Sequence, residues 1–427
     1  HPLAPARITP QHPQKVQVLQ LATEGEYQRP DIATLEEPSG PAGGVATHTP
    51  SGMSWATDDG LYSLSLGGFM HARYQAQAPS DLSTVDSAGL SLRRGRVTMG
   101  GQAGSKRLNY ALSMSLVQPS TPLFDYYMDM RYRDELTIRV GQAKLPYTRS
   151  FLASSKVRAF HELNKTQDLQ RYDRDMGVWA LGSFLDGRLH YHAGVSNGSG
   201  RNLQNDNIDM ATALRVEGVA LGEYIAPGFG DYKSTELPSL TVGAAVVHDL
   251  LRLPEMVAGI EVGNRDVDGN GIDDNIRILS TAFDAQFRLK GFELFVEGTW
   301  RHERWGTILD HTDNADLSNA VKASVTGRRN YLGITGQASY FVLPARLLVG
   351  ARLSHGRLPV LGLGSRSLAE VPMAQRAVQA DALVQLYRDG FRRVGLTYTM
   401  LNYNEKNGTD PANDVQHSVI LEAQLVL

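Results

Sequence analysis

The stretch FDYYMDMRY, residues 124–132, has the pattern that decides the fold. Apolar and aromatic side chains stand at every second position, Phe124, Tyr126, Met128, Met130 and Tyr132, and the positions between them are mostly charged. Successive side chains of a strand point to opposite faces of a sheet, so the pattern predicts a strand with one apolar face and one charged face. In a soluble sheet the charged face would meet solvent. In a membrane barrel it would face a water-filled lumen, and the apolar face would meet lipid.

Similar alternation recurs through the rest of the chain and predicts sixteen strands, an even number, as single-chain bacterial barrels require. Short and long connections alternate between many of these strands, which is typical of a barrel with short turns at one end and long loops at the other. We therefore predict an all-β fold, a transmembrane antiparallel β-barrel over residues 58–427. The predicted strands are 62–74, 90–101, 108–117, 123–133, 135–142, 175–184, 188–197, 209–219, 240–249, 278–289, 292–304, 329–341, 345–355, 376–387, 391–402 and 415–427.

Composition excludes some classes of protein. The 427 residues carry a formal net charge of −3, which gives no reason to expect nucleic acid as a partner. No stretch approaches the ~18–20 consecutive apolar residues of a membrane-spanning helix. The chain has no cysteine, which leaves its compartment open.

Residues 1–57 differ from everything that follows because prolines recur throughout them, from Pro2 to Pro50. Proline fixes φ and lacks a backbone donor, so neither a long helix nor a central strand is expected here. Two interpretations stay open: a flexible leader, or an extended arm that docks on a periplasmic or membrane partner or enters the barrel mouth.

Four segments of the chain carry a resemblance to a known family. They are LRRGRV (92–97), VGQAKLPY (140–147), DRDMGV (173–178) and YHAGVSNG (191–198). Over roughly residues 60–200 the sequence resembles the phosphate-selective porin O/P family. The resemblance implies a sixteen-stranded outer-membrane porin and a homotrimer. It also implies that the loop after the fifth strand, within residues 142–174, folds inward to narrow the pore.

Basic residues gather where such a pore would be. Between Lys144 and Asp175 seven cations oppose four carboxylates, and strand positions assigned to the lumen add further arginines. Fixed positive charge in a confined space favours anions, and a guanidinium presents several donors to phosphate or carboxylate. The alternative is that these arginines pair with acidic residues across the lumen and form a nearly neutral wall. The candidate pore residues are Lys144, Arg149, Lys156, Arg158, Lys165, Arg73, Arg94, Arg96, Arg131 and Arg139.

A second candidate site is the segment DVDGNGIDD, residues 266–274. Oxygen ligands at alternate positions around a glycine turn suit calcium, and an isoleucine carbonyl can complete the set. The candidate ligands are Asp266, Asp268, Asn270, Ile272 and Asp274. An acidic, solvated loop is the alternative.

No other pattern indicates catalysis or a required cofactor. His190 and His192 share a strand face, but no third ligand is placed beside them, so two lumen-facing polar side chains explain them better than a metal site. Serines and histidines occur without a G-x-S-x-G segment or a comparable signature.

The sequence predicts a non-enzymatic porin of a Gram-negative outer membrane, in contact with lipid. It would pass small hydrophilic solutes with a preference for anions, phosphate being one candidate. Two alternatives remain: a barrel that serves as scaffold or receptor in a larger assembly, with residues 1–57 docking, and an outer-membrane enzyme of the phospholipase type.

Overall fold

The computed structural model covers residues 1–427. It describes residues 44–49, 52–80, 82, 84–117, 123–205, 209–252, 256–257, 260–261, 275–305, 327–357, 359, 361–362, 367–368, 376–389, 392–404 and 414–426. Within these residues no helix is long and apolar enough to cross a membrane.

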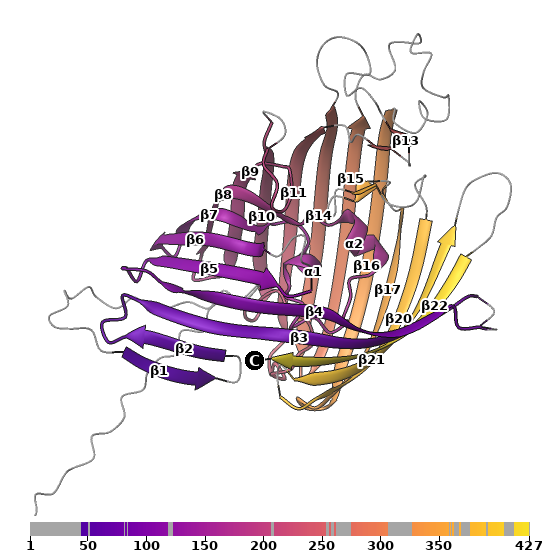
Figure 1. Cartoon of the computed structure of the whole chain (residues 1–427), viewed down its shortest axis with the longest axis horizontal. Coiled ribbons are helices and arrows are strands. Elements are labelled where there is room, and N and C mark those ends of the chain that lie inside the picture. Colours follow the sequence, from indigo (N-terminus) through magenta and orange to yellow (C-terminus); the bar gives the residue numbers. More distant parts are fainter. Residues whose placement is uncertain are drawn as a thin grey trace, which may run out of the picture.

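Sixteen strands form a closed antiparallel barrel (Figure 1). Each pairs with its neighbours in the chain, and the last strand closes the barrel on the first, with Leu425 opposite Met70. The strands are β3 (Ser63–Ala78), β4 (Ser87–Gln102), β5 (Leu108–Ser115), β6 (Leu123–Arg133), β7 (Leu136–Lys144), β8 (Arg174–Phe184), β9 (Leu189–Ser196), β10 (Ala211–Leu221), β11 (Ser239–Arg252), β14 (Asn275–Leu289), β15 (Phe292–Trp305), β16 (Gly327–Leu343), β17 (Leu347–Arg357), β20 (Arg376–Tyr387), β21 (Arg393–Asn404) and β22 (Asp414–Val426). The predicted all-β barrel of sixteen strands is confirmed.

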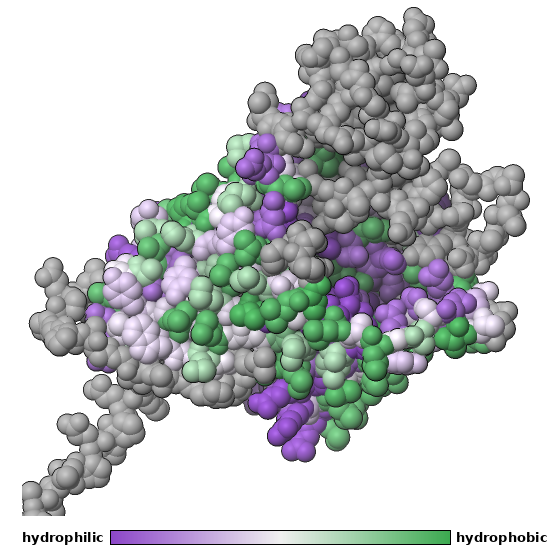
Figure 2. Space-filling view, in the orientation of Figure 1, coloured by the Kyte–Doolittle hydropathy of each residue, from purple (hydrophilic) through white to green (hydrophobic). Residues whose placement is uncertain are grey.

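The alternation of side chains explains why the sheet closes around a polar interior. On β16, Leu332 and Ile334 are exposed, whereas Thr335 and Gln337 are buried. On β20, Val384 is exposed, whereas Gln385 is fully buried. In the view of Figure 2 hydrophobic residues cover much of the outer wall, and hydrophilic residues line a hollow between the walls. An apolar outside with a polar inside is the arrangement a lipid bilayer selects.

The wall is uneven in height. Strands β5 and β9 have 8 residues each, and β7 has 9, whereas β16 has 17. A tilted strand needs ~9–11 residues to cross the hydrocarbon core, so part of the wall from β5 to β9 has only the minimum length or less.

Residues 44–57, assigned from the sequence to the N-terminal arm, contain two strands, β1 (Gly44–Thr49) and β2 (Gly52–Thr57). They form a hairpin, and β2 pairs with residues 63–66 at the start of β3 (Figure 1). β22 occupies the same edge of β3 from Phe69 onward, so β2 takes the part of that edge which β22 leaves open. Residues 1–43 of the arm lie outside the described residues.

Two small strand pairs stand apart from the barrel, β12 (Met256–Val257) with β13 (Ile260–Glu261) and β18 (Leu361–Gly362) with β19 (Ser367–Leu368). They belong to the long connections after β11 and β17.

Candidate functional site

The loop between β7 and β8, residues 145–173, contacts one side of the barrel through its first turn. The Tyr147 hydroxyl donates to the Thr281 carbonyl of β14 at 2.9 Å. The Arg149 guanidinium donates to Gln286 on β14 and to Glu217 on β10, each at 2.8 Å. The side chains of Gln286 and Glu217 are inward-facing and buried, which places the loop against the inner wall.

The second half of the loop contacts strands further round the barrel. Asn164 donates to Thr335 of β16 at 2.9 Å, and the Lys165 backbone donates to Gln379 of β20 at 2.9 Å. Arg352 of β17 donates to the Glu162 carbonyl at 2.8 Å. Residues 145–173 therefore reach inward-facing groups from β10 round to β20.

Hydrogen bonds at one end of each helix stabilise the two short helices of the loop. The short helix α1 (Arg149–Leu152) ends beside Lys144, whose ammonium donates to the carbonyls of Phe151 at 2.9 Å and Leu152 at 3.1 Å. The helix α2 (Lys165–Gln170) is capped by Asn164. The Asn164 side chain accepts a hydrogen bond from the Gln167 backbone N–H, and the Gln167 side chain accepts one from the Asn164 backbone N–H. Both arrangements satisfy backbone groups that a helix end leaves unpaired.

A second segment, the connection between β10 and β11 at residues 222–238, meets the loop from its other side. The Phe229 backbone donates to the Val157 carbonyl at 2.8 Å. Phe229 also packs with Phe160 of the loop and Phe295 of β15 in a buried apolar cluster. One part of the lumen is therefore filled with packed side chains.

The other part contains a cavity of about 860 Å³. Its wall includes residues of β3 and β4, the loop 145–173 and the strands from β17 to β22. We call this cavity the vestibule; it lies within the hydrophilic hollow of Figure 2. Eleven lining residues are cationic: Arg73, Arg93, Arg94, Arg96, Lys144, Arg158, Lys165, Arg171, Arg174, Arg201 and Arg352.

Few carboxylates balance these cations. Glu162, Asp168 and Asp173 are the acidic residues of the vestibule lining. Three further carboxylates pair with lining arginines from behind the wall: Asp125 with Arg174, Asp381 with Arg352 and Glu422 with Arg73. Among the described residues that line the vestibule, eleven cations thus stand against three carboxylates.

Three of its arginines surround one aromatic ring. The guanidinium carbons of Arg96 and Arg201 lie 4.2 Å from the centroid of Phe124, and that of Arg174 lies 4.8 Å from it. The ring faces inward because β6 bulges there: Ser113 pairs with Asp125 and Met114 with Leu123, which leaves Phe124 as the extra residue. The prediction that Phe124 shares the lipid face of β6 is wrong for this reason.

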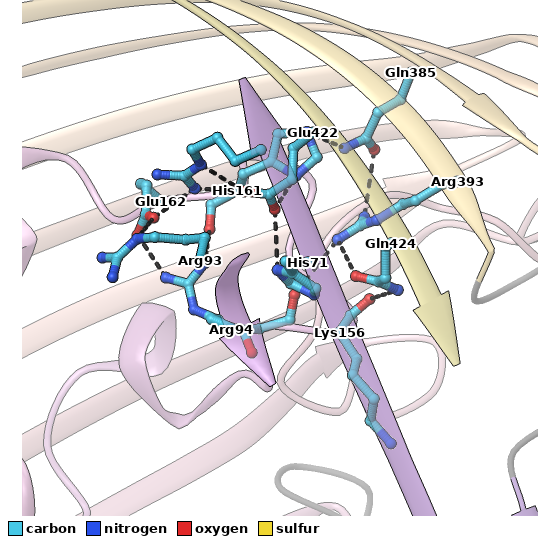
Figure 3. Close-up of polar contacts among 12 residues, drawn as sticks. His71, Arg93, Arg94, Lys156, His161, Glu162, Gln385, Arg393, Glu422 and Gln424 are labelled. Carbon is cyan, nitrogen blue, oxygen red and sulfur yellow. Dashed lines mark hydrogen bonds and ion pairs between the residues drawn. The ribbon is translucent and has the colours of Figure 1, made fainter. Parts of the chain in front are cut away.

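Glu162 lies among three other arginines (Figure 3). Its carboxylate accepts from Arg73 at 2.6 Å, from Arg93 at 2.7 Å and from Arg94 at 2.5 Å. Burial acts to raise the pKa of the Glu162 carboxyl, but the three guanidiniums outweigh burial and hold that pKa well below its usual value. The carboxylate therefore stays ionised at neutral pH and anchors the loop to β3 and β4.

Beside this cluster, two histidines converge on one carboxylate oxygen. The Nδ1 atoms of His71 on β3 and His161 on the loop each lie 2.9 Å from Oε1 of Glu422 on β22 (Figure 3). Burial lowers the pKa of His161, an effect that the neighbouring carboxylate only partly offsets, which favours a neutral ring.

The structure distributes the predicted pore residues over several places. Of the ten, six line the vestibule: Lys144, Arg158, Lys165, Arg73, Arg94 and Arg96. Four do not line it: Arg149, Lys156, Arg131 and Arg139. Arg149 is buried in the filled part of the lumen with Glu217, whereas Arg131 pairs with Asp134 and Arg139 with Asp129.

Five lining cations were not among the ten candidates. Arg171 and Arg174 belong to the cations counted between Lys144 and Asp175, and Arg352 is a strand position assigned to the lumen, whereas Arg93 and Arg201 were not expected in the pore. Arg93 directly precedes Arg94, so strict alternation would send the two side chains to opposite faces. A bulge prevents this: His71 pairs with Arg94 and Ala72 with Leu92, and Arg93 is left as the extra residue of β4. Arg201 lies in the connection after β9, where no strand period applies. In the sequence, only the two consecutive arginines of LRRGRV could have indicated that Arg93 faces the lumen.

The candidate calcium ligands, Asp266 to Asp274, lie outside the described residues, so that site stays a prediction. Within the described residues, no cluster of three or more histidine, aspartate or glutamate side chains could hold a metal ion.

Residues 64–222 match the family model of phosphate-selective porins O and P. A comparison with curated protein sequences gave no significant match.

Among solved structures, the outer membrane channel DcaP of Acinetobacter baumannii matches with a TM-score of 0.54 at 10% identity, over 86% of this chain and 99% of that one. The in-vitro folded trimer form of OmpT, an outer membrane protein of Vibrio cholerae, matches with a TM-score of 0.51 at 10% identity, over 85% of this chain and 99% of that one. At such identities the likeness concerns the fold. Residues 64–222 carry the sequence pattern of the phosphate-selective porin O and P family, and the chain as a whole has the fold of the outer-membrane porins, which places it in an outer membrane.

Proposed function

We propose that this barrel is an outer-membrane channel for small hydrophilic solutes and that it favours anions. The observation that carries the anion preference is the composition of the vestibule lining, in which eleven described residues are cationic and three are acidic. Fixed charges in a confined, low-dielectric space raise the local concentration of ions of opposite sign. Arginine dominates the lining, and its guanidinium stays charged at every physiological pH.

The loop 145–173 is the constriction of this channel. Its hydrogen bonds to β10, β14, β16, β17 and β20 support a role as a fixed partition rather than a free flap. Together with residues 222–238 it occupies part of the lumen, so solutes would pass on the arginine-rich side.

Current through the purified protein in a planar bilayer under a KCl gradient tests the proposal. An anion-selective channel gives a reversal potential of the sign set by chloride. Potassium selectivity would overturn the anion preference, and the absence of any conductance would overturn the channel itself. Repeating the measurement with phosphate replacing chloride would show whether phosphate passes at a comparable rate.

We further propose that the channel is a homotrimer joined through the low wall from β5 to β9. Met128, Val140 and Val178 are exposed on that wall, and 8-residue strands such as β5 are short for a bilayer. Neighbouring subunits would cover this wall. Native mass spectrometry in detergent tests the proposal: a trimer is expected, and Met128→Arg should dissociate it. A monomer at every concentration would contradict it.

A further inference from the structure

The cluster of Arg73, Arg93 and Arg94 around Glu162 has the geometry of an occupied carboxylate site. One carboxylate oxygen accepts from Arg73 at 2.6 Å and from Arg93 at 2.7 Å, and the other accepts from Arg94 at 2.5 Å. Three guanidiniums thus satisfy both oxygens of one planar group. Charge-assisted bonds of this kind are the strong class of hydrogen bond, and guanidinium matches carboxylate geometry closely.

The side chain that occupies the site is joined to a backbone that accepts hydrogen bonds of its own, one from Arg352 outside the cluster and one from Arg94 within it. Arg352 donates to the Glu162 carbonyl at 2.8 Å, and Arg94 donates to the His161 carbonyl at 3.3 Å. His161 itself lies against Glu422 on β22. The Glu162 side chain can therefore leave the arginines by rotation about its own bonds, while residues 161–162 stay in place.

The site is open to the vestibule. The side chain of Glu162 is 26% exposed and that of Arg93 is 44% exposed, and all three arginines line the vestibule. In Figure 3 Arg93 and Arg94 both point toward Glu162, as the bulge of β4 at Arg93 allows. A solute in the vestibule can reach the same guanidiniums that Glu162 now holds.

We propose that Arg73, Arg93 and Arg94 form a binding site for carboxylate solutes and that Glu162 is its built-in occupant, which a permeating carboxylate displaces. The inference rests on the proposed anion passage. Exchange of one carboxylate for another leaves the number of charge-assisted bonds unchanged, so the solute is bound weakly and released readily. Conduction requires such binding, favourable enough for entry yet weak enough for exit. No bond is made or broken other than these hydrogen bonds.

The test is block of chloride current by acetate in symmetrical KCl, comparing the wild type with Glu162→Gln. An amide cannot replace the carboxylate on three guanidiniums, so the site becomes vacant. The half-blocking acetate concentration should fall about tenfold or more, the change that one charge-assisted hydrogen bond supplies. Asp168→Asn is the matched control. It also removes one vestibule carboxylate, but one that pairs with Arg171, so only a general electrostatic change of about twofold is expected.

Three further results decide the matter. Equal half-blocking concentrations in wild type and Glu162→Gln would overturn the proposal, as would equal changes in Glu162→Gln and Asp168→Asn. Inorganic phosphate that blocks Glu162→Gln as strongly as acetate would overturn the carboxylate class. Glu162→Ala provides a second vacant site should the glutamine variant fold poorly, and Arg93→Gln in either background should reverse the gain. The block is measured in symmetrical KCl and ion selectivity under a KCl gradient, so the two results are independent. A cation-selective wild type would refute the proposed function, whereas the carboxylate site would still be judged by the acetate block.

Discussion

Reversing the charge of Lys165 tests whether the vestibule selects anions. Lys165 lines the cavity at the start of α2, is exposed, and is held there by its backbone bond to Gln379 rather than by its ammonium. Lys165→Glu therefore changes the charge by two units while the anchor of the loop is kept. Any change in selectivity would then come from the vestibule field.

The magnitude follows from the size of the cavity. A sphere of 860 Å³ has a radius of about 6 Å, so an ion near its centre lies within the ~10 Å screening length of the lining charges at 0.1 M salt. At a separation of ~8 Å in water each unit charge contributes about 0.5 kcal/mol before screening, so a two-unit change amounts to roughly 0.5–1 kcal/mol. Anion occupancy should fall about two- to fivefold.

The assay is the chloride-to-potassium permeability ratio from reversal potentials at 0.1 M and 1 M salt. The matched control is Lys106→Glu, the same reversal on an exposed lysine in the turn between β4 and β5, which does not line the vestibule. The shift should appear for Lys165→Glu, shrink at 1 M salt and be absent for Lys106→Glu. An unchanged ratio in Lys165→Glu, or an equal shift in both variants, would refute the reasoning.

Three other predictions concern the loop 145–173. Lys144→Met removes the ammonium that binds the carbonyls of Phe151 and Leu152; we expect a local loss of roughly 1.5–3 kcal/mol, seen as faster hydrogen exchange over residues 149–153, and unchanged exchange would contradict the capping role. Arg149→Met leaves Glu217 buried with one guanidinium fewer, which should cost roughly 3–5 kcal/mol in urea unfolding, whereas a cost below about 1 kcal/mol would show the pair to be dispensable. Because the folded pKa of Glu162 lies below its ordinary value of 4.5, its contribution to the loop anchor is complete at neutral pH and is lost only as pH falls through that lowered pKa; exchange of the amides at 161–163 relative to Glu162→Gln should thus stay constant from pH 7 to pH 5, and a midpoint inside this range would contradict the arginine cluster.

The strands were predictable because lipid and water impose a simple period. Residues 278–289 show this well: Leu279 and Phe283 are exposed, whereas Ser280 and Asp284 are buried, as alternation requires. The predicted strand boundaries mostly lie within a few residues of the observed ones, because glycine and aspartate turns mark the strand ends. Asp186-Gly187, between β8 and β9, is one such turn.

The bulges were not predictable from the same pattern. One extra residue at Phe124 turns an aromatic ring into the lumen, and one at Arg93 brings two consecutive arginines to Glu162. A bulge depends on the register between two strands, which a single strand's sequence does not contain. Likewise, residues 222–238 read only as a connection, because their contacts with the loop depend on tertiary packing.

The same limit explains why arginine on an inward strand position was an ambiguous signal. In the filled part of the lumen Arg215 pairs with Asp284, and Arg149 pairs with Glu217. Charges buried in a packed interior must be matched, since an unpaired one costs several kcal/mol. The vestibule wall is in contact with water instead, so it can keep more cations than carboxylates. The neutral wall expected from the sequence therefore describes the filled part of the lumen, and the anion-attracting wall that we propose would belong to the vestibule. The loop 145–173 separates them, because it decides which arginines meet protein and which meet water.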